Sequence, residues 1–218
     1  MPKNLIFVTL CRKVHMGAVK IAKNVEKNIH KFKVVCYTNI MKVKLLKGDI
    51  TKQTAEAIVV TANSYLSGGA EKYDSPLHLA AGPKLAEACK KIGTCRPGEA
   101  KLTPGYNLPA DFVIHAVGPT WRGGVIGEKS VLTTCYVNSM ALAAQYKLDT
   151  IAFSLLSVGA QGVPKKEAVT IALSALLQYE EDDIDISLVL ANSDTYMLAN
   201  RILAQLTNNN KPSQSDDD

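Results

Sequence analysis

Residues 150–176 of the chain read TIAFSLLSVGAQGVPKKEAVTIALSAL, and this stretch decides the class of fold. Its first part, residues 150–158, is almost continuously apolar, which predicts a strand buried on both faces. A glycine-containing turn follows, and Pro164 stands where the first turn of a helix tolerates proline. The apolar residues after it recur at helical spacing; they are Ala168, Ile171, Ala172, Ala175 and Leu176. The stretch therefore predicts a strand, a turn and an amphipathic helix.

The same alternation extends along the chain in both directions. Further strands are predicted from Met41 (KVKLLKGDI) and at 57–63, 112–118 and 186–192, with helices over 76–92 and 130–145. Continuous apolar strands that alternate with amphipathic helices indicate an α/β fold, in which helices cover both faces of a mostly parallel sheet. Ligands of such sheets bind in a crevice beyond the carboxyl ends of the strands.

The two ends of the chain differ from this core in composition. Residues 1–40 contain eight Lys/Arg and one acidic residue, whereas the remaining residues contain 17 Lys/Arg and 19 Asp/Glu. The pattern predicts a basic strand (4–10), helix (16–31) and strand (33–38), docked as an extension on a domain over 41–207. A solvated helix face explains the charge, and weak contact with nucleic acid is the alternative. Met41 is itself a candidate initiator, and the polar residues 208–218 are expected to be disordered.

Composition excludes several classes of protein. At 218 residues and 47% hydrophobic content, the chain can bury a full core. Its five cysteines show no CxxC spacing, which favours reduced, buried thiols, a cytoplasmic or nuclear location and no metal site. The apolar run at residues 5–11 is too short to cross a bilayer and precedes no A-x-A cleavage site, so neither a signal peptide nor a membrane partner is expected.

The first candidate for ligand chemistry is Gly48-Asp49-Ile50-Thr51, which ends a predicted strand. A carboxylate at this position can accept a hydrogen bond from an exocyclic amine, and the next backbone N–H can donate to a ring nitrogen. Together these groups would recognise the edge of an adenine. The alternative is structural, because Asp49 or Thr51 could simply cap a short helix.

Asn63 and the loop after it form the second candidate. Asn63 ends the predicted strand 57–63, and Ser67-Gly68-Gly69-Ala70 follows. Glycines allow backbone to approach a ligand closely, and an asparagine amide can donate to and accept from a ribose. A plain turn is the alternative.

The third candidate is Ser157-Val158-Gly159-Ala160-Gln161-Gly162, between a core strand and a helix. Such a turn presents unpaired N–H groups and the positive end of a helix dipole, which suits a diphosphate. It matches neither a Walker A motif nor G-x-G-x-x-G, and a plain connection is the alternative. His78 and His115 are expected to be packed core residues, and no Ser–His–Asp or Cys–His arrangement is evident.

In order along the chain, these segments resemble the macrodomain family. KLLKGDIT, AIVVTAN, a glycine loop and LHLAAGPKLAEAC match its first half, and GEAKLTPGYNLPADFVIHAVGPTW and IAFSLLSVGAQGVP match its second. The match covers about residues 42–205, and Gly98 to Pro119 is its most specific part. The resemblance implies a three-layer α/β/α fold that binds ADP-ribose as a ligand and needs no cofactor.

The resemblance also implies a role for each candidate. Asp49 would hold the adenine amine, Ile50 would contact the ring, Asn63 would bind the distal ribose inside loop 67–74, and residues 157–162 would wrap the diphosphate. The full set of implied ligand contacts is Asp49, Ile50, Ala62, Asn63, Gly68, Gly69, Asp74, Ser157, Val158, Gly159, Ala160, Gln161, Gly162 and Asn192. Some members of the family also hydrolyse mono-ADP-ribose from acidic side chains or deacetylate O-acetyl-ADP-ribose. Asn63 and Asp74 would be the catalytic residues here, since both would lie near the distal ribose.

The chain departs from the family pattern near the distal ribose. Val60 replaces the first of two usual asparagines, and Glu71, Lys72 and Tyr73 occupy a loop in which small residues are usual. Gln161 and Ala191 stand where aromatic residues commonly flank the ribose and the adenine, and Tyr73 or Tyr196 are candidate substitutes.

Three functions remain open from the sequence. The first is binding of ADP-ribose or of mono-ADP-ribosylated protein. The second is hydrolysis of the ADP-ribosyl bond, and the third is a degenerate domain that binds protein or RNA through residues 1–40.

Overall fold

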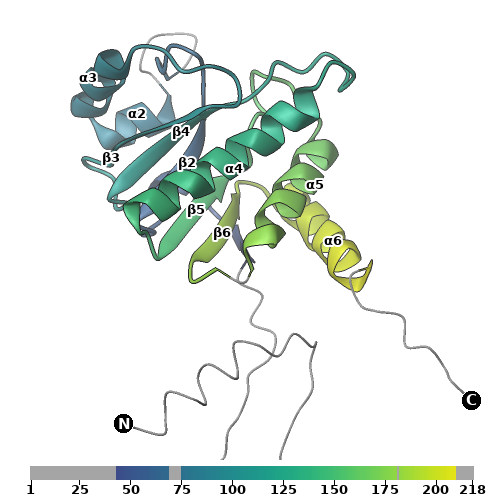
Figure 1. The fold of residues 1–218 in the computed structure, drawn as a ribbon. Helices are drawn as coiled ribbons and strands as arrows, with labels where there is room; N and C mark the ends of the chain where they lie inside the picture. Colours follow the sequence, from purple (N-terminus) through teal and green to yellow (C-terminus); the bar gives the residue numbers. More distant parts are fainter. Residues whose placement is uncertain (1–42, 69–74, 181, 210–218) are drawn as a thin grey trace, which may run out of the picture. The chain divides into compact units, whose positions relative to one another are not determined.

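The computed structural model describes residues 43–68, 75–180 and 182–209. Within these residues six strands form one sheet in the order β1-β6-β5-β2-β4-β3 (Figure 1). The strands are β1 (Val43–Lys47), β2 (Ala57–Ala62), β3 (Ala100–Pro104), β4 (Phe112–Val117), β5 (Thr150–Ser154) and β6 (Asp185–Leu190). Every pairing is parallel except that of β3 with β4, so the expected mostly parallel sheet is confirmed.

Helices cover both faces of this sheet. One face packs against α4 (Glu128–Tyr146), α5 (Lys165–Leu176) and α6 (Ser193–Asn209), and the other against α2 (Pro76–Ala81) and α3 (Pro83–Ile92) (Figure 1). Two single-turn 3-10 helices, η1 (Ile50–Lys52) and η2 (Leu177–Tyr179), complete the described elements. The arrangement is the expected three-layer α/β/α fold.

The central strands are apolar without alternation because both of their faces are covered. In β2 the side chains of Ala57, Ile58, Val59 and Val60 are at most 6% exposed, and they alternate between the two core clusters. Val60 packs in the cluster beneath α2 and α3, so the residue that departs from the family pattern is a core residue here. The edge strand β3 was not predicted, because its five residues, AKLTP, carry little apolar character.

Several predicted boundaries are wrong; the strand predicted over 42–50, for example, ends at Lys47. The single helix expected over 76–92 is two helices, because Gly82 adopts a positive φ of 81° and Pro83 begins the next helix. The strand predicted over 150–158 ends at Ser154, where the chain turns into the loop. Helix α6 continues to Asn209, and so includes the first two residues of the segment expected to be disordered.

The remaining expectations about the ends of the chain lie outside the described residues. These are the strand–helix–strand extension at 1–40 and the tail from residue 210. No helix in the part of the chain that the structure describes has the length and apolarity needed to cross a membrane.

The cysteine and histidine predictions are confirmed where the structure describes them. Cys89, Cys95 and Cys135 are free and buried, as expected for reduced thiols. His78 and His115 are 5% and 1% exposed, as expected for packed core groups.

Candidate functional site

A crevice for a ligand forms where neighbouring strands send their chains to opposite faces of a sheet. Strands β2 and β5 are neighbours, and the chain leaves β2 toward α2 on one face and β5 toward α5 on the other. The ends of β1 and β6 join the same edge, since Gly48 N donates to Leu190 O at 3.1 Å. The carboxyl edge around β2 and β5 is therefore the candidate site.

The predicted ligand residues meet at this edge. Asp49 and Ile50 follow β1, Ala62 ends β2 and precedes Asn63 and Gly68, residues 157–162 follow β5, and Asn192 follows β6. Gly69 and Asp74, which the sequence also assigned to the site, lie outside the described residues.

The loop at 157–162 leaves consecutive backbone donors unpaired at this edge. It is closed on itself by Gly162 N to Gly159 O (2.9 Å) and Val163 N to Ser157 O (3.0 Å), and Ser157 N donates to Thr61 Oγ1 on β2 at 2.9 Å. The backbone N–H groups of the four residues 158–161 have no hydrogen-bond partner within the described chain. Consecutive free N–H groups just before a helix form a concave donor surface for an anion.

Gln161 ties this loop to the rest of the edge. Its side-chain nitrogen donates to the carbonyls of Ala62 (3.3 Å) and Gly118 (3.1 Å), at the ends of β2 and β4. The backbone carbonyl of Gln161 accepts from Trp121 N at 2.8 Å. The residue that replaces an aromatic side chain in the family pattern is therefore a polar bridge between three segments.

Gly118 is a site residue that sequence reasoning missed. A Cβ atom at this position would lie 1.8 Å from Ser157 Oγ, 2.9 Å from Gln161 Oε1 and 3.1 Å from Ser157 Cβ, so any larger residue would force the Ser157 side chain and the loop to shift. The signal in the sequence was a glycine directly after a strand, but only the fold shows which segment approaches it.

Asp49 caps a short helix, as the structural interpretation predicts, and still presents a hydrogen-bond acceptor. Its Oδ1 caps η1 by accepting from Thr51 N (2.9 Å) and Thr51 Oγ1 (2.8 Å). These hydrogen bonds, with Lys52 nearby, hold the pKa of the exposed Asp49 carboxyl below its ordinary value. The ionised group retains Oδ2, which makes no hydrogen bond within the described residues and can accept from an amine.

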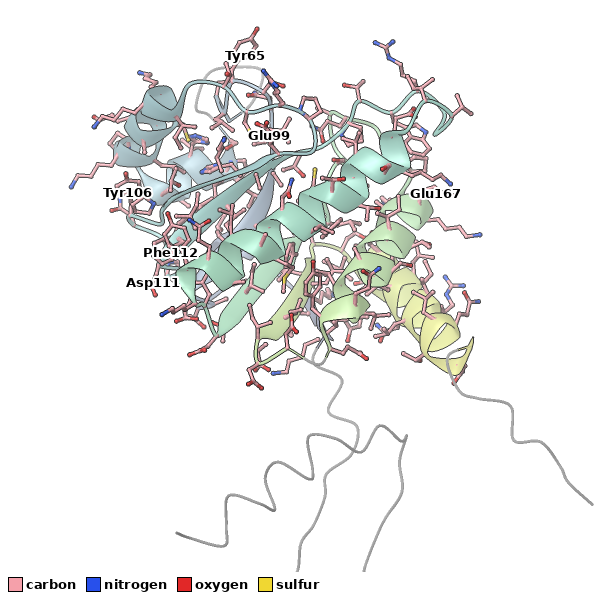
Figure 2. The ribbon with its side chains drawn as sticks, in the orientation of Figure 1. Tyr65, Glu99, Tyr106, Asp111, Phe112 and Glu167 are labelled. Carbon is pink, nitrogen blue, oxygen red and sulfur yellow. The ribbon has the colours of Figure 1, made fainter. Side chains whose placement is uncertain are left out.

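Asn63 is committed to the turn in which it lies. Its Oδ1 accepts from Tyr65 N and Ser67 N, both at 3.1 Å, and its Nδ2 donates to Ser67 Oγ at 2.9 Å. Tyr65 is 72% exposed. Figure 2 shows its side chain beyond the end of the sheet where β2 ends, far from Phe112, which begins β4 at the opposite end. The turn interpretation is confirmed by this geometry, while the roles of Asn63 in ribose binding and catalysis remain predictions.

His78 contacts the chain on both sides of residues 69–74. Its Nδ1 hydrogen-bonds to Ser75 Oγ at 3.0 Å, and a Cβ atom on Gly68 would lie 2.4 Å from the same nitrogen. Gly68 also has a positive φ of 84°, so its backbone and its contact both require glycine.

The β6 end of the edge is built around a helix cap. Asn192 Oδ1 accepts from Thr195 N (2.9 Å) and Thr195 Oγ1 (2.7 Å), as an N-cap of α6 does. Ala191 is exposed, and Tyr196 is half-buried against the core. Neither the contact of Asn192 with a ligand nor a substitution by Tyr196 for the missing aromatic is tested by this geometry.

The buried histidine in β4 is structural. His115 Nε2 is 3.0 Å from Thr103 Oγ1 and 3.9 Å from Cys89 Sγ. Burial, with His78 nearby, lowers the pKa of His115 to about 3, so the ring is neutral at physiological pH. Among the described residues, no three His, Cys, Asp or Glu side chains are grouped so that they could hold a metal ion.

Comparison with known proteins places this chain in a family. The family model of the Macro domain matches residues 59–172. A macro domain-containing protein of Methanosarcina mazei is 43% identical over 77% of this chain and 91% of its own length. A solved macrodomain of Oceanobacillus iheyensis with ADP is 34% identical, with a TM-score of 0.71 over 76% of this chain and 91% of its own. A Trypanosoma brucei macrodomain in complex with ADP-ribose is 32% identical, with a TM-score of 0.67 over 73% of this chain and 68% of its own.

Proposed function

Because the chain belongs to the macrodomain family, we propose that it binds ADP-ribose at the carboxyl edge of its sheet. The observation that carries the proposal is the run of free backbone N–H groups at 158–161, which suits the two negative charges of a diphosphate. Solved relatives with ADP and with ADP-ribose support the same class of ligand.

The adenine end of the ligand is assigned to Asp49. Its carboxylate is ionised, and Oδ2 is not used in the cap, so this oxygen can accept from the exocyclic amine. The diphosphate would then lie against residues 157–162, between β5 and α5.

Calorimetric titration with ADP-ribose tests the proposal directly. Saturable heat and a rise in melting temperature are expected, and neither at millimolar ligand would reject it. A hydrogen bond to a charged group contributes about 1.5–3 kcal/mol, so Asp49→Ala should weaken binding roughly tenfold to a hundredfold.

Asp49→Asn separates the adenine contact from the cap. Asparagine caps helices as well as aspartate does, so the unfolding free energy should stay near that of the wild type. Its amide presents a donor where the adenine amine needs an acceptor, so affinity should still fall. If Asp49→Asn bound ADP-ribose with wild-type affinity, the assignment of Asp49 to the adenine contact would be wrong.

The finer function that follows is recognition of mono-ADP-ribosylated protein, in which the same ligand is covalently attached to a polypeptide. Hydrolysis of that attachment is a second candidate, because three hydrogen bonds hold Asn63 in a fixed orientation at the edge. Release of ADP-ribose from a mono-ADP-ribosylated protein by the wild type, but not by Asn63→Ala or Asp74→Ala, would support it. Equal background release by all three proteins would exclude turnover.

A further inference from the structure

The turn after β2 presents an aromatic side chain to solvent beside the candidate site. Tyr65 N donates to Asn63 Oδ1 at 3.1 Å, and the next residue, Leu66, is fully buried. The backbone of Tyr65 is thus fixed on both sides, while its side chain is 72% exposed. Its hydroxyl makes no hydrogen bond within the described residues. An ordered turn that holds an amphipathic ring outward makes that ring available to a partner.

An exposed arginine lies next to this turn. Ser64 O accepts from Cys95 N at 2.9 Å, which brings the loop between α3 and β3 against the turn after β2. Arg96 follows Cys95 and is exposed, and its backbone N–H donates to Glu99 Oε2 at 3.0 Å. Its guanidinium makes no ion pair or hydrogen bond within the described residues. We call the side chains of Tyr65 and Arg96 the aromatic–cation rim.

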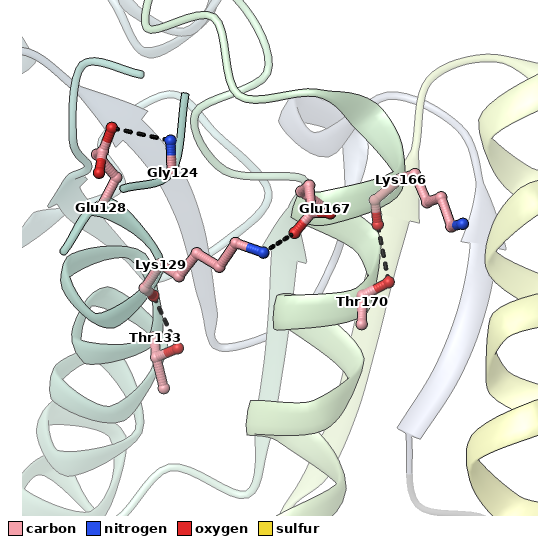
Figure 3. Close-up of polar contacts among 7 residues, drawn as sticks. All are labelled: Gly124, Glu128, Lys129, Thr133, Lys166, Glu167 and Thr170. Atoms are coloured by element: carbon pink, nitrogen blue, oxygen red, sulfur yellow. Dashed lines mark hydrogen bonds and ion pairs between the residues drawn. The ribbon is translucent and has the colours of Figure 1, made fainter. Parts of the chain in front are cut away.

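The charge of Arg96 differs in this respect from charges near the start of α4. The Lys129 ammonium pairs with Glu167 at 2.7 Å, and Glu128 accepts from backbone N–H groups, including that of Gly124 at 3.1 Å (Figure 3). Those charges are satisfied within the domain. The charge of Arg96 is available to a carboxylate from outside.

The aromatic–cation rim lies at the end of the sheet that holds the candidate site. Val117 N donates to Glu99 O at 3.1 Å, so the segment 96–99 lies at the carboxyl end of β4, next to the carboxyl end of β2. Figure 2 shows Tyr65 and Glu99 at this end of the sheet, and Tyr106 toward the other. The rim therefore adjoins the ends of β2 and β4.

The order of the strands gives the direction in which a bound ligand would run. The adenine contact is assigned to Asp49, after β1, and the diphosphate to residues 157–162, after β5. In the order β1-β6-β5-β2-β4-β3, the path from β1 to β5 crosses two strand spacings, or about 10 Å, and continues toward β2 and β4. The distal ribose, and any group attached to it, would therefore lie beside the ends of β2 and β4.

We propose that the aromatic–cation rim docks the polypeptide segment that flanks an ADP-ribosylated residue, and that it favours an acidic residue in that segment. The inference rests on the proposed binding of ADP-ribose and gives the modified protein a second contact at the same site. Tyrosine and arginine are among the residue types that most often carry the binding energy of protein contacts. The free guanidinium of Arg96 supplies the preference for a carboxylate.

Three synthetic peptides test the inference, each with one ADP-ribosyl group on a hydrolysis-resistant linkage. The modified residue is flanked by aspartate in the first, by serine in the second and by lysine in the third. The wild type should bind the aspartate peptide about fivefold to tenfold more tightly than the serine peptide, and the lysine peptide most weakly. Added salt should reduce these differences, because exposed charges are screened.

Two variants separate the cation from the ring. Arg96→Gln should bind the three peptides alike, because the charge that ranks them is gone. Tyr65→Ala should weaken all three by a similar factor, about fivefold, and keep their order. Neither side chain bonds to another described residue, so both variants should keep the wild-type stability and affinity for free ADP-ribose.

Arg201→Gln and Tyr106→Ala are the matched controls. Arg201 is exposed on α6, and Tyr106 lies between β3 and β4, toward the opposite end of the sheet. Both variants should bind the three peptides as the wild type does.

Several outcomes would overturn the inference while free ADP-ribose still bound. They are equal binding of the three peptides by the wild type, an unchanged order in Arg96→Gln, or wild-type peptide affinity in Tyr65→Ala. Tighter binding of a dimer of ADP-ribose than of every peptide, lost in Tyr65→Ala, would assign the rim to a second nucleotide and overturn it too. Absence of binding to free ADP-ribose would instead reject the proposed function on which the inference rests.

Discussion

The loops that follow β2 and β5 occupy the same edge of the sheet but use their polar groups in opposite ways. After β2, Asn63 spends its side-chain oxygen and one N–H on its own turn, and Gly68 is packed against His78. After β5, residues 158–161 keep four backbone N–H groups without a partner in the described chain. The polar atoms of the first loop are used within its own turn, whereas the second loop, besides two internal backbone hydrogen bonds, is held by contacts from β2 and from the end of β4.

The outside support of the second loop comes from neighbouring strands. Thr61 accepts from Ser157 N, and the Gln161 amide spans Ala62 O and Gly118 O. Because side chains anchor this loop at its ends, its backbone donors need not turn inward. The Asn63 side chain is the type of group that often binds a ligand, yet its hydrogen bonds are made within its own turn. The backbone N–H groups of Ala160 and Gln161, which no side chain advertises, are the ones that remain available.

Breaking the support of the β5 loop should have the largest effect. Gly118→Ala places a Cβ atom 1.8 Å from Ser157 Oγ. Overpacking of this kind costs about 3 kcal/mol of unfolding free energy and should displace the loop enough to weaken ADP-ribose binding more than tenfold. Chemical denaturation and calorimetry measure the two effects. Gly159→Ala is the control, since nothing lies within 4 Å of its Cβ position, and it should leave stability within about 0.5 kcal/mol of the wild type.

A smaller loss of stability is expected on the β2 side from Gly68→Ala. Its positive φ and its approach to His78 together should cost about 2 kcal/mol. Gly93→Ala isolates the backbone part, because Gly93 has a φ of 81° and no atom within 4 Å of its Cβ position. Equal losses in the two variants would show that the His78 contact contributes nothing.

Mild acid should destabilise the face of the sheet covered by α2 and α3 more than the face covered by α4, α5 and α6. Burial lowers the pKa of His115 from 6.5 to about 3, so in this range the unfolded chain binds a proton that the folded chain does not. The contribution of neutral His115 to the free energy of unfolding is therefore fully present above pH 6.5. It falls by about 1.4 kcal/mol per pH unit as the pH drops toward 3. Hydrogen exchange should show α2 and α3 loosening before α5, because within the described residues both histidines face the former side. His115→Gln should flatten the dependence between pH 6.5 and 5, and an unchanged slope would contradict the assignment.

The smallest effect is expected from Asn63→Ala. Loss of its hydrogen bonds within the turn should lower the unfolding free energy by about 1 kcal/mol. ADP should bind as tightly as before, because the diphosphate contacts are assigned to the β5 loop. Asn63→Asp keeps the acceptor for Tyr65 N and Ser67 N and should recover most of the stability. A large loss of ADP affinity in Asn63→Ala would show that the two loops are coupled.

Much of the fold could be predicted from the sequence because its central strands are short apolar runs that alternate with amphipathic helices. The runs at 57–63, 112–118 and 186–192 are apolar on both faces, and only a parallel sheet covered on two sides accommodates them. The helix break at Gly82 and the short β3 were missed, since a single glycine or a weakly apolar strand is decided by packing. The gathering of Asp49, Asn63, residues 157–162 and Asn192 at one edge followed from the parallel topology.

The sequence by itself determined the three layers, the edge that holds the candidate site and the family, because apolar periodicity and the order of the motifs can be read directly from the chain. Only the tertiary structure decided which polar groups remain available to a ligand. The hydrogen bonds that occupy Asn63 lie within four residues, but those that support residues 157–162 come from residues about 40 to 100 positions away. Whether a backbone N–H is free or hydrogen-bonded depends on which groups the fold brings beside it, and the residue type alone does not indicate this.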